Sequence, residues 1–502
     1  MVRNSNMVAL VVFAALLSAQ QADQLPDTVP AKRMNEFIES FNTKDSDKIG
    51  GWISSNFSPN ALKILSKDEW TKRISGAFNL APISVAAVLK SSDTTLIVRL
   101  KGNTNLPLAL RLDLETDKPY QVVGAALGNP DEVMGIKNTK KYAHWATLET
   151  LVNQVVKDYK LPALSVAYEQ IGKPALYDAE GVKSSKQPTE IADGDRMQVG
   201  ALGKSMTATL LSKLVEMKKL TWTSTLAEML PNVKLAEAYK TVTIDDLFQH
   251  KSGLPREFPY GMDDMQKMTE KAKDATDVRR IFVSDLLSRA SVSKPGTQLV
   301  DSDVDYVVAG YIAERLIGKS FEWLMQRYVF DPMKMKSAMI APIGSEGQVG
   351  SQGEVLGHLY GDFGYTPFLL PNPVRDMMLA PAGADITCSM FDLEHFASLH
   401  LTGMKGTDNV LTAASYKHMH TAPSGTSRDQ DLYGWTFNPS FASDEPCQAR
   451  SGTDGSCYAD MTIWPDNNLV IVAATNAGVT RQPSPTLQVI LAIRDRYENK
   501  EN

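Results

Sequence analysis

The sequence predicts an α+β protein made of two domains, on three observations. At 502 residues the chain is too long for one compact core. Between 30 and 128, apolar residues at helical spacing give way to an alternation with period two, which is typical of helices followed by antiparallel strands. From about 145 onward, strand patterns stand at both ends of a helical middle, which predicts one sheet built from the two ends of that domain.

The composition limits the class of protein. Hydrophobic residues make up 43% of the chain and charged residues 22%, which excludes a largely disordered protein. The formal net charge of −6 leaves no basic surplus, so we expect no nucleic-acid partner. Apolar runs of 18 or more residues do not occur, which excludes a multi-pass membrane protein.

Residues 1–22 have the pattern of a secretory signal peptide. Arg3 precedes an apolar stretch from Met7 to Leu17, and small and polar residues follow it. The stretch is too short to span a bilayer stably. We therefore expect a secreted or periplasmic protein without a membrane span once the signal is removed; a buried N-terminal helix is the alternative.

The small domain is expected at 30–128. Apolar residues at i, i+3, i+4 and i+7 from Met34 predict a helix, and a second helical stretch lies near 68–78. Alternating apolar residues at 96–100 and 106–114 predict half-buried strands. This order resembles the ketosteroid-isomerase-like fold in pattern only and implies no function. An α+β domain of another topology is the alternative.

A connector is expected at 129–144, followed by the large domain at 145–500. The elements expected there are a helix at 148–157, a hairpin of 164–168 and 175–182, strands at 458–464 and 469–474, and a last helix at 485–497.

The cysteines do not form a disulfide framework, because there are only three, Cys388, Cys447 and Cys457. Cys447 and Cys457 flank a predicted hairpin turn, so a cross-strand bridge and two buried free thiols both remain open. Cys-x-x-Cys and His-x-x-x-His pairs do not occur, and His418 and His420 are expected to be structural or exposed. We expect neither a metal nor another cofactor.

The most informative stretch is 200–211, which predicts a helix that buries one face. Its apolar residues recur every four positions, at Leu202, Met206, Leu210 and Leu214. The stretch resembles the nucleophile helix of serine β-lactamases and penicillin-binding proteins, whose Ser-x-x-Lys places a serine and a lysine on one face. In that family the lysine helps to take the serine proton so that the oxygen can attack a carbonyl.

Further matches follow in the order of that family, most closely of its class C-like branch. They are His250-Lys251-Ser252-Gly253-Leu254-Pro255, Pro295-Gly296-Thr297, Tyr306 to Gly310, Phe330 to Met333, Pro381-Ala382-Gly383, Gly434-Trp435 and Thr475 to Gly478. The resemblance covers about 145–500. It implies a β-lactamase/transpeptidase-like antiparallel sheet flanked by helices, with a helical subdomain.

The same resemblance shows that the catalytic motifs are degenerate. Ala201 stands at the serine position, although Lys204 is retained. The Tyr-x-Asn position reads Asp301-Ser302-Asp303, and the Lys/His-x-Gly position reads Arg450-Ser451-Gly452. Loss of a nucleophile alone costs a serine hydrolase roughly a million-fold in rate. Replacements in three motifs indicate a natural loss of the chemistry.

Other serines are poor substitutes for the missing nucleophile. Ser205 adjoins Lys204, but a helix turns by about 100° per residue, so it points off that face. Ser291-Val292-Ser293-Lys294 matches Ser-x-x-Lys as a string, yet Lys294 precedes Pro295, which predicts a loop. Tyr306 follows the degenerate Tyr-x-Asn motif and is expected to pack.

A charge pattern replaces the catalytic groups. We expect Lys204 to lie near Asp301 or Asp303, because burying it unpaired would be costly; carboxylates that point to solvent are the alternative. Arg450 offers a planar fork to a ligand carboxylate, unless it is a surface arginine. The candidate binding residues are Ala201, Lys204, Asp301, Asp303, Arg450, Ser451 and Gly452.

We predict a non-catalytic relative whose cleft binds a peptide-like or cell-wall-derived ligand, or which serves as a scaffold. The alternative is a serine-hydrolase-type esterase, peptidase or β-lactamase that uses a rearranged site. A third reading is hydrolysis by water with Asp301 or Asp303 as general base, for which the sequence offers no electrophilic partner.

Overall fold

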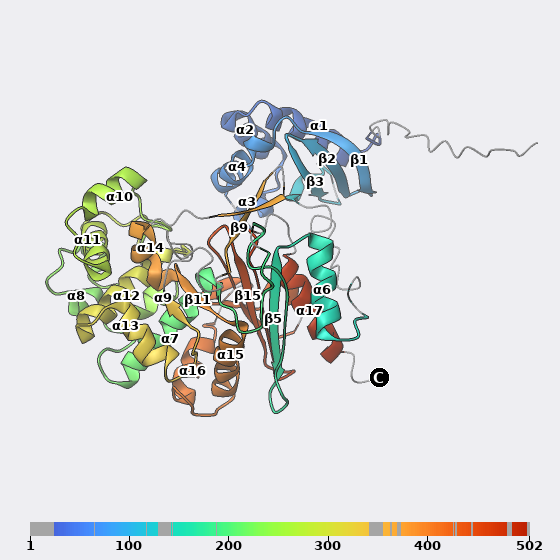
Figure 1. The fold of residues 1–502 in the computed structure, drawn as a ribbon. Helices are drawn as coiled ribbons and strands as arrows, with labels where there is room; N and C mark the ends of the chain where they lie inside the picture. The colour runs from blue at the N-terminus through green and yellow to red at the C-terminus, as the bar shows by residue number, and fades with distance from the viewer. Residues whose placement is uncertain are drawn as a thin grey trace, which may run out of the picture. The chain divides into compact units, whose positions relative to one another are not determined.

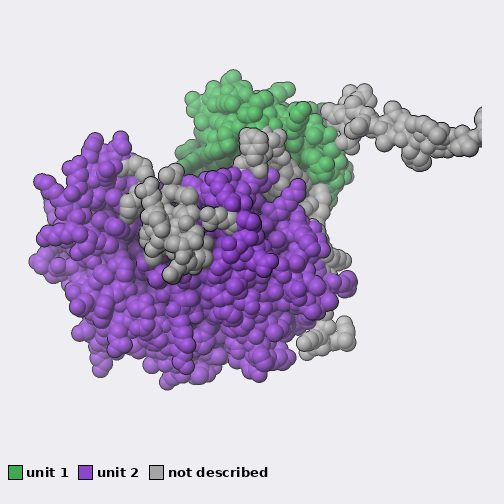
Figure 2. All heavy atoms as spheres, viewed as in Figure 1, with its two compact units in different colours: residues 1–138 green, residues 139–502 purple. Residues whose placement is uncertain are grey.

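The computed structural model describes residues 25–64, 66–116, 118–128, 142, 144–186, 188–340, 355–361, 364–368, 373–424, 426, 429–442, 445–478 and 484–498. The chain divides into two compact units, residues 1–138 and 139–502 (Figure 2). The predicted signal segment 1–22 and all of the predicted connector except residues 142 and 144 lie outside the described residues.

The first unit places helices against a four-stranded antiparallel sheet of order β1-β2-β3-β4 (Figure 1). Its elements are α1 (Val29–Asn42), α2 (Ser46–Asn56), α3 (Pro59–Ile64), α4 (Lys67–Ser75), the 3₁₀ turn η1 (Phe78–Leu80), β1 (Ser84–Ser91), β2 (Thr95–Gly102), β3 (Thr104–Leu114) and β4 (Val122–Gly128).

The apolar residues whose spacing predicted this unit form its hydrophobic core. The Thr28 side chain accepts a hydrogen bond from the Ala31 amide and caps α1, whose Met34, Phe37 and Phe41 are buried, so the predicted helix is confirmed. Alternate residues of β2 and β3 are buried against these helices, as the period of two predicts. The likeness to a ketosteroid-isomerase-like fold stays a prediction.

The second unit contains a seven-stranded antiparallel sheet of order β12-β13-β14-β15-β16-β5-β6 among the described residues. Its strands are β5 (Ala163–Gln170), β6 (Leu176–Gly181), β12 (Gln430–Leu432), β13 (Trp435–Phe437), β14 (Gln448–Thr453), β15 (Tyr458–Trp464) and β16 (Leu469–Thr475). Strand β16 pairs with β5, from Leu469 opposite Gln170 to Thr475 opposite Leu164. The prediction of one sheet built from both ends of the domain is therefore confirmed.

Helices cover both faces of this sheet (Figure 1). Helices α6 (Leu148–Tyr159) and α17 (Pro485–Glu498) pack on the face that receives Leu164 and Ile471. Helices α7 (Gly203–Glu216) and α15 (Met390–Met404) share a core with Ala167 and Val472 on the other face. Because side chains alternate along a strand, neighbouring apolar residues of β5 and β16 serve two different cores.

The middle of the unit supplies the remaining elements. They are β7 (Met197–Gln198), the 3₁₀ turn η3 (Gly200–Leu202), α8 (Leu226–Met229), η4 (Glu237–Tyr239), α9 (Ile244–Phe248), α10 (Met262–Thr269), α11 (Ala275–Leu287), α12 (Asp303–Ile317), α13 (Phe321–Met325), the π-helical turn η5 (Gln326–Phe330), β8 (Met339–Ile340), β9 (His358–Gly361), β10 (Gly364–Pro367), α14 (Pro373–Leu379), η6 (Ala380–Ala382), β11 (Ile386–Cys388), α16 (Ala413–His420) and η7 (Ser440–Ala442). None of the described helices combines the length and the apolar character that a membrane crossing requires.

The cysteines are buried free thiols, and the cross-strand bridge does not form. The register pairs Gln448 with Ile463 and Thr453 with Tyr458. Cys447 therefore lies at the open end of the β14–β15 hairpin, while Cys457 lies beside its turn. The two thiols therefore lie at opposite ends of the hairpin and do not face each other across the strands. A disulfide bond between them is geometrically excluded.

Candidate functional site

The site is built around the start of α7. Ala201 lies in the turn η3, and Lys204 follows in the first turn of α7. Gly452 of β14 explains how closely the strand approaches this turn: a Cβ there would come within 2.1 Å of the Val199 carbonyl oxygen and 2.7 Å of the Ala201 nitrogen. Only glycine allows β14 to pack directly on η3.

Lys204 joins the two carboxylates of the degenerate motif. Its Nζ lies 2.7 Å from Asp303 Oδ1 and 3.3 Å from Asp301 Oδ1. The lysine side chain is only 2% exposed, whereas the side chains of Asp301 and Asp303 are 45% and 41% exposed. The proximity that the sequence predicts is confirmed, while a ligand-binding role for these residues stays a prediction.

A buried hydrogen-bond network holds the carboxylate segment in place. The Ser302 side chain caps α12 by accepting from the amides of Val304 and Asp305, and it donates to the Pro255 carbonyl at 2.6 Å. Asp305 contacts His250 Nδ1 at 2.9 Å and accepts from Ser252 Oγ at 2.5 Å. The His-x-Ser-Gly segment therefore positions the start of α12.

The surroundings of the half-exposed Asp301 and the buried Asp305 shift the pKa values of these two carboxyl groups in opposite directions. Burial raises the pKa of Asp301, but the nearby Lys204, His250 and Arg450 outweigh it and lower that pKa from 3.8 to about 2. Burial raises the pKa of Asp305, although its hydrogen bonds with His250 and Ser252 lower it. The cluster thus keeps its exposed carboxylate ionised.

The Asp301 shift predicts a pH-dependent contribution to stability. The unfolded chain takes up this proton near pH 3.8 and the folded chain near pH 2, so the stabilisation is present above 3.8 and is lost as the pH falls towards 2. Urea unfolding of the native chain and of Asp301→Asn at several pH values measures it. The difference in free energy of unfolding is expected to shrink on acidification below about pH 4.

Asp263→Asn is the matched control, because Asp263 is an exposed residue of α10. Its difference from the native chain is expected to stay near zero throughout. A difference for Asp301→Asn that grows as the pH falls would contradict the assignment.

Arg450 is buried and paired, so the alternative of a surface arginine is wrong. Its side chain is 6% exposed, Nη1 donates to Asp431 Oδ2 at 2.6 Å, and Nε donates to the Ala201 carbonyl at 3.2 Å. Burial opposes the guanidinium charge, but Asp431 outweighs it and raises the pKa of Arg450. The Nε and Nη1 donors of the Arg450 guanidinium are therefore already occupied within the protein.

Ser451 does not join the other candidates. Its Oγ donates to Asp460 Oδ1 at 2.5 Å, and Ser451 stands directly opposite Asp460 in the β14–β15 ladder. Arg450 and Gly452 point to the opposite face of β14 because side chains alternate along a strand. The structure therefore does not bring Ser451 together with Arg450 and Gly452, and a ligand-binding role for it stays a prediction.

The other serines near the motifs are not placed to act as nucleophiles. Ser205 is fully buried, and its Oγ donates to the Leu202 carbonyl at 2.7 Å. Ser291 to Lys294 lies in a loop, as the following proline predicts.

The two histidines of α16 have partners within the protein. His418 pairs with Asp245 at 3.0 Å, and the buried His420 bonds to His400 at 2.8 Å.

Three further groups complete the site, and sequence reasoning missed the first of them. Asp431, the partner of Arg450, comes from the three-residue strand β12 and follows no recognisable motif. Tyr306 packs as expected, with Lys204 Nζ 5.3 Å from its ring centroid, but its buried hydroxyl has no hydrogen-bond partner within the described ranges. The buried His250 Nε2 likewise has none there, and it lies 3.6 Å from Asp301 Oδ1.

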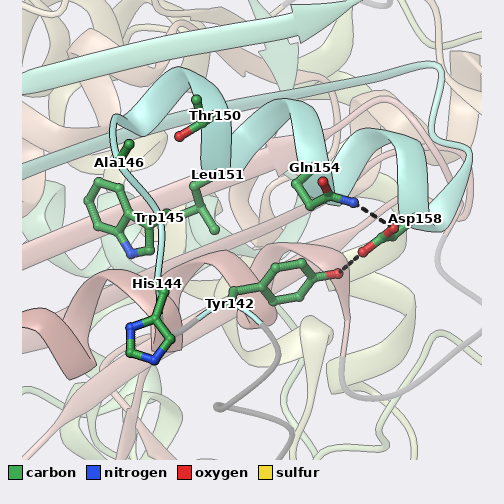
Figure 3. A pocket seen from close by; sticks show the side chains of 8 residues that line it. All are labelled: Tyr142, His144, Trp145, Ala146, Thr150, Leu151, Gln154 and Asp158. Atoms are coloured by element: carbon green, nitrogen blue, oxygen red, sulfur yellow. Dashed lines mark hydrogen bonds between the residues drawn. The ribbon is translucent and has the colours of Figure 1, made fainter.

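Two hollows lie apart from the Lys204 cluster. One, of about 530 Å³, borders α6 on the face of the sheet away from α7 (Figure 3). Its lining is Tyr142, His144, Trp145, Ala146, Thr150, Leu151, Gln154 and Asp158. The other, of about 420 Å³, lies beside α9 and α16 and includes Asp245, His418 and Tyr433.

In the part of the chain that the structure describes, no group of three or more His, Cys, Asp or Glu residues has a metal-holding arrangement.

Comparison with known proteins places the second unit in a family. The sequence model described as Beta-lactamase matches residues 148–492, more than half of the chain. Penicillin-binding protein 4 of Amycolatopsis lactamdurans is 25% identical over 356 residues, covering 67% of this chain and 86% of that protein. A β-lactamase of Pseudomonas fluorescens is 24% identical over 375 residues, covering 70% and 94%.

Solved structures agree on the fold. The class C β-lactamase of Rhodobacter sphaeroides superposes with a TM-score of 0.55 at 16% identity, covering 71% of this chain and 100% of that one. The octameric penicillin-binding protein homologue of Pyrococcus abyssi gives 0.55 at 18% identity, covering 69% and 76%. The second unit has the predicted β-lactamase/transpeptidase-like fold, and the chain belongs to the Beta-lactamase family.

Proposed function

We propose that the protein is a non-catalytic member of its family, in which the site around Lys204 binds a peptide-like ligand without acyl transfer. One observation carries the proposal: a methyl group at Ala201 stands beside a lysine that is paired with two carboxylates, at 2.7 and 3.3 Å. Acyl transfer by a serine needs a hydroxyl oxygen to attack and a base to receive its proton. Both requirements fail at the same place.

The state of Lys204 supports this proposal independently of Ala201. An ammonium that donates to Asp301 and forms an ion pair with Asp303 has no lone pair with which to take a proton. The carboxylates stand where the resemblance places a phenol and an amide, so the acid/base group of the family is missing as well. The nearby hydroxyl of Ser205 is committed to the Leu202 carbonyl.

The free-energy cost of burying the charged side chains of Lys204 and Arg450 supports a binding role. Burying both Lys204 and Arg450 requires desolvation, which ion pairs offset only with good geometry. Apolar side chains of similar size would often serve stability equally well. The charge of Lys204, next to half-exposed carboxylates, and of Arg450, next to Asp431, supports recognition of a polar ligand over a purely structural role.

Covalent labelling tests the proposal directly. The intact chain, incubated with a labelled penicillin or with a fluorophosphonate, is expected to show no mass increase, because no side chain at the site can form an acyl or phosphonyl ester. An active serine β-lactamase is the positive control. An adduct on any residue of the site would contradict the proposal and favour the serine-hydrolase alternative.

Restoring the hydroxyl alone is expected to be insufficient. Ala201→Ser returns the nucleophile, but Lys204 stays paired with Asp301 and Asp303, so we expect no acylation by the labelled penicillin. Ala201→Ser combined with Asp301→Tyr and Asp303→Asn is the matched variant, which removes both carboxylates and is expected to acylate at a measurable rate. Rapid acylation of Ala201→Ser itself would show that the carboxylates do not silence the lysine.

We also infer that the protein is exported. The charged start, short apolar stretch and polar continuation of residues 1–22 support this inference. Residues 1–22 are expected to be absent from the mature chain, and N-terminal sequencing of the protein purified from its source checks this. An intact N-terminus would contradict it.

A further inference from the structure

The Lys204 cluster presents negative charge to solvent and hides its positive charge. Lys204 is 2% exposed, whereas the Asp301 and Asp303 side chains are 45% and 41% exposed. A molecule that approaches the cluster from water therefore meets carboxylate oxygens first. The lysine lies behind them and is already engaged by both.

Lys204, His250 and Arg450 together stabilise the charge of Asp301, whereas among the described residues Asp303 is paired with Lys204. Lys204 supplies a single positive charge for two carboxylates. The Arg450 guanidinium is engaged by Asp431 at 2.6 Å. Arg256 approaches Asp301 Oδ2 only to 3.9 Å and is 73% exposed, so water screens this contact strongly. The Asp303 carboxylate therefore shares its compensating cation, Lys204, with Asp301.

A second observation, on the histidine beside the carboxylates, also indicates a ligand. His250 is 3% exposed, and its Nε2 lacks a hydrogen-bond partner in the described part of the chain while lying 3.6 Å from Asp301 Oδ1. Buried polar atoms in folded proteins nearly always have partners. The imidazole edge therefore faces the cluster with an unused hydrogen-bonding position, which a polar group of a ligand can satisfy.

From this geometry we infer that the site takes a ligand through a cationic nitrogen, such as the free amino group of a peptide, held between Asp301 and Asp303 beside His250. The inference rests on the proposed function and names its ligand class. A primary ammonium has three donors, enough to reach both carboxylates at once. An anionic group would instead meet two like charges ahead of the buried lysine, so the site rejects it.

Two derivatives of D-alanyl-D-alanine test the inference by calorimetry on the full chain. D-alanyl-D-alanine amide carries an amino group and no carboxylate, and N-acetyl-D-alanyl-D-alanine carries a carboxylate and no amino group. The amide is expected to bind at least tenfold more tightly than the acetylated acid. Its affinity is expected to fall when the salt concentration rises, because part of the attraction is between partly exposed charges.

Variants tie the binding to the named residues. Asp303→Asn keeps the shape of the side chain and removes its charge, and is expected to weaken binding of the amide at least tenfold. Asp301→Asn is expected to act in the same direction, and a thermal melt of each variant verifies that it is folded. Asp263→Asn on α10 changes net charge equally at a distant exposed position and is expected to leave the affinity unchanged.

The outcomes separate this inference from the proposed function. Equal or tighter binding of the acetylated acid, failure of both dipeptides to bind, or an unchanged affinity in Asp303→Asn would each overturn the cationic-ligand inference. None of these results bears on covalent chemistry. A mass increase with labelled penicillin would instead overturn the proposed function, whatever the dipeptide affinities.

Discussion

Replacing Arg279 by methionine is expected to lower the free energy of unfolding by about 3–5 kcal/mol. Arg279, in α11, is fully buried, and its Nη2 lies 2.7 Å from Glu314 Oε1 and 3.0 Å from Glu322 Oε1. Glu314, in α12, is only 1% exposed in its side chain, so removal of the arginine leaves a carboxylate charge in the protein interior. Urea unfolding of the variant and the native chain measures the loss.

Two variants separate this effect from simple loss of packing. Arg279→Met combined with Glu314→Leu removes both buried charges and is expected to regain most of the lost stability. Lys204→Met also removes a buried cation, but its carboxylate partners are 45% and 41% exposed and are rehydrated, so a loss below about 1 kcal/mol is expected. Similar losses in Arg279→Met and Lys204→Met would contradict this account.

Replacing Gly383 by alanine is expected to cost about 3 kcal/mol or more, because strain and overpacking add. Gly383 ends η6 at a φ of +108°, and a Cβ there would lie 2.0 Å from the Gly200 carbonyl oxygen and 3.1 Å from the Ala201 Cα. Both contacts are to backbone, which cannot rotate out of the way. The turn that carries Ala201 must shift, so affinity for D-alanyl-D-alanine amide is expected to fall together with stability.

Gly406 is the matched control for this substitution. Its φ of +104° is nearly the same, but a Cβ there would meet nothing within 4 Å. Gly406→Ala is therefore expected to cost only the backbone strain, about 1–2 kcal/mol, and to leave dipeptide affinity unchanged. Equal thermal melting temperatures for the two alanine variants would show that the contact with Gly200 is not limiting.

The large elements of the fold could be predicted because their apolar periodicity is long enough to read. Helix α7, the β5–β6 hairpin and strands β15 and β16 all appear where period and turn residues indicate. Strands β7, β8 and β11 could not be predicted, since two or three residues carry no period. They form a sheet only through pairings between segments far apart in the chain.

The site could be predicted in part for a related reason. The order of motifs places Ala201, Lys204 and the Asp301–Asp303 segment together, since the family resemblance carries the tertiary arrangement implicitly. It does not reveal that Arg450 is bound to Asp431, because a three-residue strand without a motif supplies that carboxylate. It also does not reveal that Ser451 faces Asp460, because membership of a motif does not specify on which face of a strand a side chain lies.

The sequence by itself determined which chemical groups are present: a methyl group at Ala201, an amine at Lys204, and carboxylates at Asp301 and Asp303. It also determined the family, through the order of its motifs. Only the tertiary structure decided that the amine is buried and the carboxylates face water. Burial and pairing depend on segments about a hundred residues apart meeting in a medium of low dielectric constant, and no local pattern encodes that meeting.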